Sequence, residues 1–277
     1  MLDRKVKVKR IENLGAGNYL MTLSSPEQAR LVRPGHFLMV KCCEDVEDNP
    51  LLRRPFSVFN IHCHARTGKP LDLEILIKDV GAGTHKLVQS RPGECLCTLG
   101  PQGQPFKVQD GIGQDVRYGC LVAGGVGIAA FYLLARKLMA LGVTPVLFYG
   151  ARTAGELVLR DYFERLGIDV RLTTEDGSLG ERGLVTAPLK RFLKEHSRAG
   201  LRLYACGPWA MMRAVHLLAA RNRVACEVSL EARMGCSLGA CMGCVVRASG
   251  VSSHYIRVCM EGPVIDSSLI DWESPPL

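Results

Sequence analysis

Apolar and polar positions alternate in short runs over the first hundred residues, as is typical of β-strands with one buried face. Val6, Val8 and Ile11 are interspersed with charged residues, and turn-forming residues such as Arg33-Pro34-Gly35 separate the later runs. Regularly spaced short strands of this kind predict a small antiparallel β-barrel. We expect its strands at 19–23, 37–42, 56–61, 71–78 and 94–99, and one helix at 84–89.

Beyond residue 105 the pattern changes to buried-strand runs that alternate with helical periodicity. The run Leu121-Val122-Ala123 is followed by a glycine turn and then by 128–141, which has the length and apolar face of a helix. A strand–helix–strand series of this kind predicts a parallel, doubly wound sheet. The later strands are expected at 145–149, 169–173 and 201–205, and the later helices near 156–166, 185–196 and 209–221.

Near the C-terminus, three cysteines follow the spacing Cys-x4-Cys-x2-Cys, and a fourth follows after fourteen intervening residues. This is the plant-type spacing for a [2Fe–2S] cluster, in which four thiolates bind two irons. The glycines interspersed between residues 235 and 243 permit backbone conformations that direct N–H groups toward sulfur. The predicted cluster ligands are Cys236, Cys241, Cys244 and Cys259.

Two other interpretations of these cysteines stay open at this point. Four thiolates also suit a tetrahedral Zn²⁺, although zinc ribbons favour two Cys-x2-Cys pairs. Disulfides are disfavoured, because the N-terminal sequence Met-Leu-Asp-Arg-Lys has no apolar segment of a signal peptide. In an intracellular chain of 277 residues, 12 cysteines point instead to metal or redox chemistry.

Composition excludes several classes of partner. The formal net charge is +8, but the basic residues are dispersed and not interleaved with aromatic ones, so we expect no nucleic-acid binding. No apolar run approaches the ~20 residues that a membrane span needs, so we expect a cytoplasmic protein. These patterns together predict an α+β multi-domain fold. Its units are an N-terminal antiparallel β-barrel (1–104), a central doubly wound parallel α/β sheet (105–224) and a small C-terminal iron–sulfur module (225–277).

The glycine turn after residue 123 has the sequence Gly125-x-Gly127-x-x-Ala130. It lies between a predicted strand and a predicted helix, which is the context of a dinucleotide-binding fingerprint. Glycines there let the backbone approach a pyrophosphate, which then rests at the helix N-terminus. We expect Gly125, Val126 and Gly127 to contact a dinucleotide, although a glycine turn of this kind also occurs without a ligand.

The choice between NAD and NADP depends on the residues after the next two strands. Arg152 follows the second strand and would suit a 2′-phosphate, whereas Glu175 and Asp176 follow the third strand and would repel one. We take the acidic pair to favour NAD.

A third stretch, Cys206-Gly207-Pro208, follows a later strand at the sheet edge where ligands of such folds bind. We expect these three residues near the nicotinamide. The alternative is a buried cysteine followed by a proline that begins a helix.

Residues 54–57, with the sequence Arg54-Pro55-Phe56-Ser57, lie on a predicted barrel strand. Arginine can pair with phosphate, an aromatic ring can pack on a flavin, and serine can donate a hydrogen bond. Gly81-Ala82-Gly83-Thr84 begins the short helix and offers a second anion site. Taken alone, these residues also fit an ordinary surface strand.

The order of these motifs resembles that of the ferredoxin–NADP reductase superfamily, with Leu99-Gly100-Pro101 between the flavin and glycine motifs. With the cysteine motif appended, the whole chain resembles the electron-transfer subunits of NAD-dependent dihydroorotate dehydrogenase. The segments 174–183, 231–236 and 259–264 also match the pattern of that family.

This resemblance implies FAD on the barrel, a [2Fe–2S] cluster on the four cysteines and NAD as substrate. It implies a flavin- and iron–sulfur-dependent oxidoreductase subunit that passes electrons from an FMN-bearing dihydroorotate dehydrogenase catalytic subunit to NAD⁺ in pyrimidine biosynthesis. It also implies a complex with two copies of each chain. No general acid or base is nominated. The implied FAD contacts are Arg54, Pro55, Phe56, Ser57, Leu76, Ile77, Lys78, Gly83 and Thr84.

Two alternatives to this function stay open. Similar subunits serve sulfide dehydrogenases and ferredoxin-linked bifurcating complexes, and they share these motifs. A non-enzymatic redox sensor would use the cluster alone, and the complete set of flavin and dinucleotide motifs disfavours it, because a sensor needs no hydride site.

Overall fold

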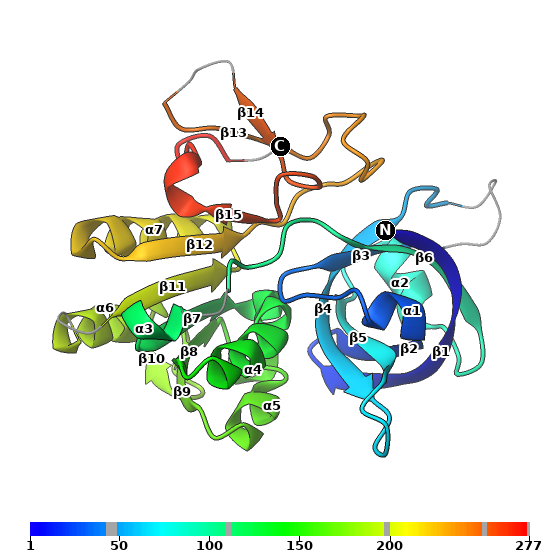
Figure 1. Cartoon of the computed structure of the whole chain (residues 1–277), viewed down its shortest axis with the longest axis horizontal. Coiled ribbons are helices and arrows are strands. Elements are labelled where there is room, and N and C mark those ends of the chain that lie inside the picture. Colours follow the sequence, from blue (N-terminus) through cyan, green and yellow to red (C-terminus); the bar gives the residue numbers. More distant parts are fainter. Residues whose placement is uncertain (43–48, 109–111, 197–199, 251–253, 276–277) are drawn as a thin grey trace.

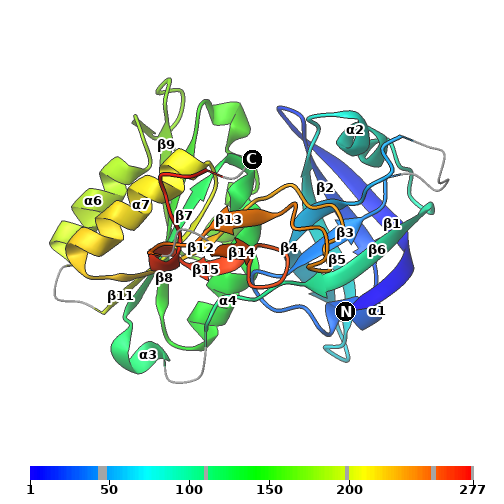
Figure 2. The same cartoon turned by 90° about the horizontal axis from the view of Figure 1, so that it is seen from above.

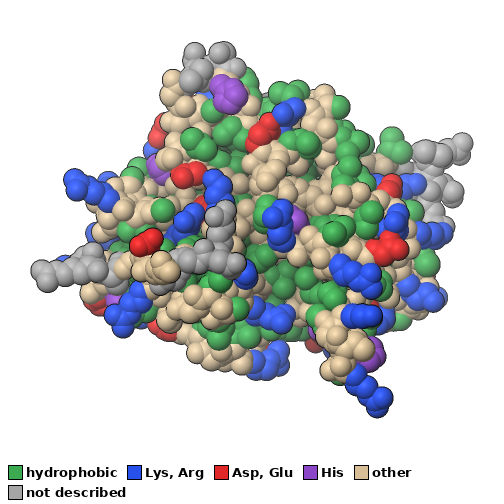
Figure 3. Space-filling model, viewed as in Figure 1, with side chains coloured by type: hydrophobic (Ala, Val, Ile, Leu, Met, Phe, Trp, Pro, Cys, Tyr) green, Lys and Arg blue, Asp and Glu red, His purple; other side chains and the backbone are tan. Residues whose placement is uncertain are grey.

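In a computed structural model of the chain, residues 1–42, 49–108, 112–196, 200–250 and 254–275 are described. Figure 1 shows a barrel at the right, an α/β sheet at the left, and a small C-terminal region above the line where the two meet. On the face shown in Figure 3, Lys and Arg side chains are spread over both parts. None of the helices among the described residues is long and apolar enough to cross a membrane.

The N-terminal part is a closed antiparallel barrel with the strand order β1-β2-β5-β4-β3-β6, which confirms the predicted barrel. Alternate side chains such as Val6 and Val8 are buried inside it, as the sequence pattern predicts. The short helix α1 (Pro26–Ala29) was not predicted, since four residues are too few to show helical periodicity. The other elements are β1 (Leu2–Gly15), β2 (Asn18–Ser24), β3 (Phe37–Val40), β4 (Arg54–Cys63), β5 (Pro70–Lys78), α2 (Ala82–Val88) and β6 (Cys95–Gln102).

The second part is a seven-stranded sheet with the order β10-β9-β8-β7-β11-β12-β15. Its neighbouring strands are parallel except for β15, which runs antiparallel to β12 at the edge. The strands are β7 (Tyr118–Gly124), β8 (Thr144–Ala151), β9 (Asp169–Thr174), β10 (Glu181–Arg182), β11 (Leu201–Cys206), β12 (Ala225–Ser229) and β15 (Val264–Asp266).

Helices cover both faces of this sheet (Figure 2), so the doubly wound arrangement is confirmed. On β7, Cys120 and Val122 pack with the helices α6 (Thr186–Glu195) and α7 (Trp209–Asn222). The intervening residues Leu121 and Ala123 pack with α4 (Tyr132–Ala140) and α5 (Arg160–Arg165) on the other face. A short α3 (Ile112–Asp115) precedes β7.

Two predicted helices differ in detail from the structure. The helix expected at 128–141 is divided into a 3₁₀ segment, η1 (Gly125–Ala130), and α4, which begins at Tyr132. The helix expected near 156–166 begins only at Arg160, after η2 (Ala154–Glu156). Leu159 has a φ of +60°, a left-handed conformation that interrupts the helix before that point.

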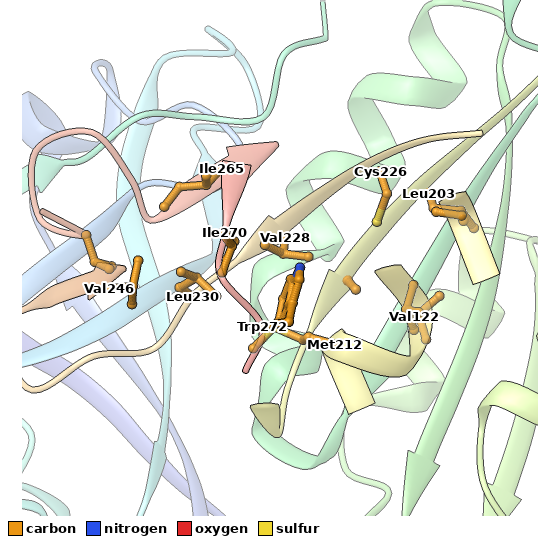
Figure 4. Packing of buried hydrophobic residues seen from close by; sticks show 14 of the residues in the cluster. Val122, Leu203, Met212, Cys226, Val228, Leu230, Val246, Ile265, Ile270 and Trp272 are labelled. Atoms are coloured by element: carbon orange, nitrogen blue, oxygen red, sulfur yellow. The ribbon is translucent and has the colours of Figure 1, made fainter. Parts of the chain in front are cut away.

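The C-terminal region is built partly into the sheet. β12 and β15 extend it, and Trp272 packs against Met212 of α7 and Val228 of β12 (Figure 4). The remaining elements are β13 (Val245–Arg247), β14 (Tyr255–Arg257) and η3 (Ser267–Leu269). Because the sheet continues through β12 and β15, the division of the chain into 1–104, 105–224 and 225–277 stays a prediction.

Candidate functional site

A cleft of about 440 Å³ opens where the barrel faces the sheet. Strand β4 forms one wall and the end of β5 adjoins it, while Val126 and Ala129 of η1 lie on the opposite side. The structure thus brings most of the predicted flavin residues into one cleft. Those that line it are Arg54, Pro55, Phe56, Ser57, Leu76, Lys78 and Thr84.

Two polar groups of this cleft are held by the backbone around them. Nη1 of Arg54 donates to the carbonyl oxygen of Leu52 at 2.7 Å, which fixes the guanidinium at the cleft wall. Oγ1 of Thr84 accepts hydrogen bonds from the amides of Val80 (2.9 Å) and Gly81 (3.1 Å) at the start of α2. The cleft therefore presents a fixed cation and a capped helix start, both suited to phosphate.

Ile77 and Gly83 lie outside the cleft lining. Ile77 is fully buried in the barrel core, with its side chain directed away from the cleft. Gly83 lies beneath Arg54, where an added Cβ would come within 3.3 Å of Nε of Arg54 and 3.1 Å of Sγ of Cys42. Its role in this structure is to leave room for that arginine.

A second cleft, of about 660 Å³, lies at the carboxyl ends of β7, β8 and β11. This is the edge where open parallel sheets bind ligands. Five of the predicted dinucleotide residues line it, namely Gly125, Val126, Arg152, Gly207 and Pro208.

Gly127 and Cys206 lie behind this cleft and do not line it. The side chain of Cys206 is buried at 2% exposure, and burial raises the pKa of its thiol. The turn at Gly127 packs directly on the carbonyl group of Cys206. In this structure both residues therefore shape the wall that their neighbours present to the cleft.

Arg152 at the edge of this cleft forms an ion pair with Glu156. Nη2 of Arg152 donates to Oε1 of Glu156 at 2.6 Å, and Nζ of Lys78 from the barrel reaches the same oxygen at 3.4 Å. The hydrogen bond from Arg152 lowers the pKa of Glu156 to about 2, so this carboxylate is charged at neutral pH. The barrel and the sheet are thus linked across the site by one carboxylate.

The two clefts join. Lys78, Val126 and Glu231 line both of them, so the space along the barrel continues into the space above the sheet edge. Glu231 is an exposed residue at this junction. Neither Glu156 nor Glu231 was predicted as a site residue. Only Glu231 had an indication in the sequence, since it begins the family-like segment 231–236.

The four predicted cluster cysteines lie in the loops after β12 and after β14, and they form two pairs. The thiol of Cys236 interacts with that of Cys241, and the thiol of Cys259 interacts with that of Cys244. Among the described residues, no three Cys, His, Asp or Glu side chains converge closely enough to hold one metal ion. Four thiolates in these two loops fit the ligand set of a [2Fe–2S] cluster.

Backbone amides of the first loop point at these sulfurs. The amides of Leu238 (3.3 Å) and Cys241 (3.4 Å) donate to Sγ of Cys236 and lower the pKa of its thiol to about 6. The amide of Gly243 donates to Sγ of Cys241 at 3.4 Å. Amide donors of this kind stabilise thiolates, so this loop suits the sulfur ligands of an iron–sulfur cluster.

The end of the barrel holds both cluster loops. Nε2 of Gln102 donates to the carbonyl oxygen of Ser237, and Nε2 of Gln104 donates to that of Met260, each at 3.2 Å. The barrel that forms the flavin cleft is therefore bonded directly to the cysteine loops. Cys241 is exposed at the outer side of these loops, together with the side chains of Leu238, Met242 and Met260.

Family models match two parts of the chain. The model described as the iron–sulfur cluster binding domain of dihydroorotate dehydrogenase B matches residues 231–271, and the oxidoreductase NAD-binding domain matches residues 121–217. The first includes all four cysteines of the paired loops, and the second includes the glycine turn and the 206–208 segment.

Similar proteins match nearly end to end. The electron transfer subunit of dihydroorotate dehydrogenase B (NAD(+)) from Desulforamulus reducens is 36% identical, over 96% of this chain and 97% of that protein. A homolog of this subunit from Aquifex aeolicus is 35% identical, over 90% of this chain and 91% of that protein.

Among solved structures, one described for flavin-based electron bifurcation by an NADH-dependent reduced ferredoxin–NADP oxidoreductase is 27% identical. It has a TM-score of 0.80 and covers 98% of this chain and 91% of that chain. A ferredoxin NADP⁺ reductase from Neisseria gonorrhoeae has a TM-score of 0.62 at 16% identity, over 79% of this chain and 91% of that chain, and shows the shared fold.

Proposed function

Because this chain belongs to the family of dihydroorotate dehydrogenase B (NAD(+)) electron transfer subunits, we propose that it carries electrons from an FMN-bearing dihydroorotate dehydrogenase subunit to NAD⁺ in pyrimidine biosynthesis. The observation that carries this proposal is the joining of the two clefts at Lys78, Val126 and Glu231. A flavin along β4 and a dinucleotide above the sheet edge would meet there. When bound, FAD exchanges a hydride with NAD and single electrons with an iron–sulfur cluster.

The barrel residues would hold the flavin. Arg54 and the start of α2 at Thr84 are the groups suited to its phosphates, and the strand residues Pro55 and Phe56 supply apolar contact. The glycine turn at Gly125 would hold the dinucleotide pyrophosphate. The contribution of these residues is orientation, which brings reacting groups within about 3–3.5 Å of each other. We assign no general acid or base.

The paired cysteines Cys236/Cys241 and Cys244/Cys259 would hold a [2Fe–2S] cluster. The exposed side of their loops, with Leu238, Met242 and Met260 around Cys241, is the side that a donor protein can approach. We place the FMN-bearing catalytic subunit against this side, in a complex with two copies of each chain. The cysteine-rich composition and oxygen-sensitive thiolate chemistry of the site agree with a cytoplasmic location.

One experiment tests the chemistry of the chain itself. The chain is purified anaerobically with FAD bound and is then mixed with NADH. The flavin absorbance at about 450 nm is followed over time. Bleaching of this band within the time of a catalytic turnover supports the proposal. A flavin that stays oxidised with excess NADH would exclude it, and would favour a redox sensor or a structural role for the metal.

A second donor is favoured by one observation. The solved structure described for electron bifurcation covers 98% of this chain at 27% identity. The same cofactors could therefore serve a ferredoxin-linked bifurcating complex or a sulfide dehydrogenase. Identification of the subunit that copurifies with this chain distinguishes these donors from a dihydroorotate-oxidising partner.

A further inference from the structure

Glu156 binds the only arginine that lines the dinucleotide cleft in the part of the chain that the structure describes. We propose that Glu156 determines the selectivity of this cleft, by occupying the Arg152 guanidinium that would otherwise bind the 2′-phosphate of NADP. This inference deepens the proposed function and depends on it, since it concerns the same dinucleotide site.

The contacts between the two residues engage one whole side of the arginine. Oε1 of Glu156 accepts from Nη2 of Arg152 at 2.6 Å, and Oε2 accepts from Nε at 3.3 Å. Oε2 also accepts from the backbone amide of Arg152 at 3.3 Å. A guanidinium held by both oxygens of one carboxylate has that pair of N–H groups satisfied and its charge compensated, which weakens its attraction for a phosphate.

The position of Arg152 is the one at which 2′-phosphates are recognised. It follows β8, the strand after the glycine turn and helix, which is where folds of this kind contact the adenosine ribose. An acidic residue there binds the ribose hydroxyls, whereas an arginine accommodates the phosphate. An arginine at this place would by itself predict NADP.

The surrounding charges make the site unfavourable for a phosphate despite Arg152. The side chain of Glu156 is only 15% exposed, while that of Arg152 is 73% exposed. Glu156 also lies 3.4 Å from Nζ of Lys78, so two cations of the cleft share one carboxylate. Glu175 lines the same cleft, and its charge acts on Arg152. A 2′-phosphate would therefore meet paired cations and an additional carboxylate.

The hydrogen bond from Arg152 is also the principal reason that the pKa of Glu156 falls to about 2. The carboxylate is consequently ionised throughout the pH range in which a dinucleotide binds, and the ion pair persists there. Replacement of this one carboxylate would free Arg152 and Lys78 together.

The test is the change Glu156→Gln in the full chain with its FAD and cluster bound. Glutamine keeps the size of the side chain and removes its charge. Binding of 2′,5′-ADP, NADP⁺ and NAD⁺ is measured by calorimetry at fixed salt. We expect affinity for 2′,5′-ADP and NADP⁺ to rise roughly tenfold or more relative to NAD⁺, as befits a charged hydrogen bond to phosphate.

Two further variants assign the effect to Arg152. The double change Glu156→Gln with Arg152→Ala should lose the gain, because the guanidinium that would bind the phosphate is absent. Glu164→Gln removes the same charge from an exposed position on α5 and should leave the NADP⁺ to NAD⁺ affinity ratio as it is. Glu156→Ser gives a second test if the glutamine variant does not fold.

The outcomes distinguish a failure of this inference from a failure of the proposed function. An unchanged affinity ratio in folded Glu156→Gln, or a gain that persists without Arg152, would overturn the role of Glu156 while NAD⁺ still binds. If neither NAD⁺ nor 2′,5′-ADP binds to any form of the chain, the dinucleotide site itself is wrong, and the proposed function fails with it.

Discussion

A Cβ atom placed on Gly127 would lie 2.2 Å from the carbonyl oxygen of Cys206. The glycine turn after β7 and the end of β11 are therefore in direct backbone contact, at a distance that no larger residue allows. This contact sets the floor of the dinucleotide cleft, because Gly125 and Gly207 on either side of it line the open space.

Gly127→Ala is expected to destabilise the chain and weaken dinucleotide binding together. The turn must move away from Cys206 to admit a methyl group, at a cost of about 1–3 kcal/mol for overpacking. Chemical unfolding and NADH titration of the flavin band measure the two effects. Gly155→Ala is the control, since the nearest atom to its added Cβ, Oγ1 of Thr153, is 3.9 Å away. Equal stability and equal NADH affinity of the two variants would show that the contact between Gly127 and Cys206 is not the cause.

Arg54→Gln is expected to weaken FAD binding at least about tenfold, because a charged hydrogen bond to phosphate is lost. Retention of FAD after dialysis, or calorimetry on the apoprotein, gives the measurement. The neighbouring change Arg53→Gln removes the same charge from a residue that pairs with Asp3, so FAD affinity should stay near that of the parent chain. A similar loss in both variants would show that general charge, and not Arg54, attracts the cofactor.

Cys241→Ser is expected to remove the cluster and leave the flavin reaction. Iron content and the electron paramagnetic resonance signal of the reduced chain should be lost, and partner-linked NAD⁺ reduction should cease. NADH should still bleach the flavin. Cys63→Ser, at an exposed free cysteine on the barrel, should keep iron and activity. Partner-linked activity that survives in Cys241→Ser would exclude the cluster as the entry point for electrons.

Nη2 of Arg202 lies 3.3 Å from Oε2 of Glu227. Arg202→Met is expected to cost about 3–5 kcal/mol of stability, because it leaves Glu227 as a buried charge without this cation. Glu227 is 2% exposed, and its carboxylate otherwise accepts hydrogen bonds from the amide of Lys107 at 3.3 Å. In contrast, Arg213→Met breaks a pair with the exposed Glu273 and should cost less than about 1 kcal/mol. Denaturant unfolding of both variants makes the comparison.

The loss of unfolding free energy caused by Arg202→Met, called the deficit below, should depend on pH. Burial raises the pKa of Glu227, so the folded state binds a proton at a higher pH than the unfolded state does. The contribution of such a group to stability decreases as the pH rises. Loss of Arg202 raises this pKa further, so the deficit should be largest at about pH 8 and decrease toward about pH 5. A deficit that grows on acidification would contradict this assignment.

The sequence contained enough to predict the barrel, the doubly wound sheet and the cysteine motif. Strand alternation at Val6 and Val8 and the apolar run at Leu121 reflect burial directly, so local pattern and tertiary structure agree. The interruption of the helix after Gly127 was not predictable, because the glycine turn packs against Cys206 from a strand that lies some eighty residues away in sequence.

Contacts between distant segments also explain why some residues of the site could not be predicted from the sequence. Glu156 and Lys78 lie on different parts of the fold, and neither residue alone indicates that they share an ion pair. Glu231 reaches the site because the segment after β12 lines the barrel cleft. The predicted contact of Ile77 with FAD stays a prediction, although the alternation along β5 directs its side chain to the barrel core.

The most direct test of the central claim is dihydroorotate-dependent reduction of NAD⁺ by the native complex, isolated from its own cells through this subunit. We expect NADH formation that requires both dihydroorotate and the copurified catalytic subunit. A complex that reduces dyes with NADH but does not oxidise dihydroorotate would contradict the assignment to pyrimidine biosynthesis, and would point to sulfide or ferredoxin as the electron donor.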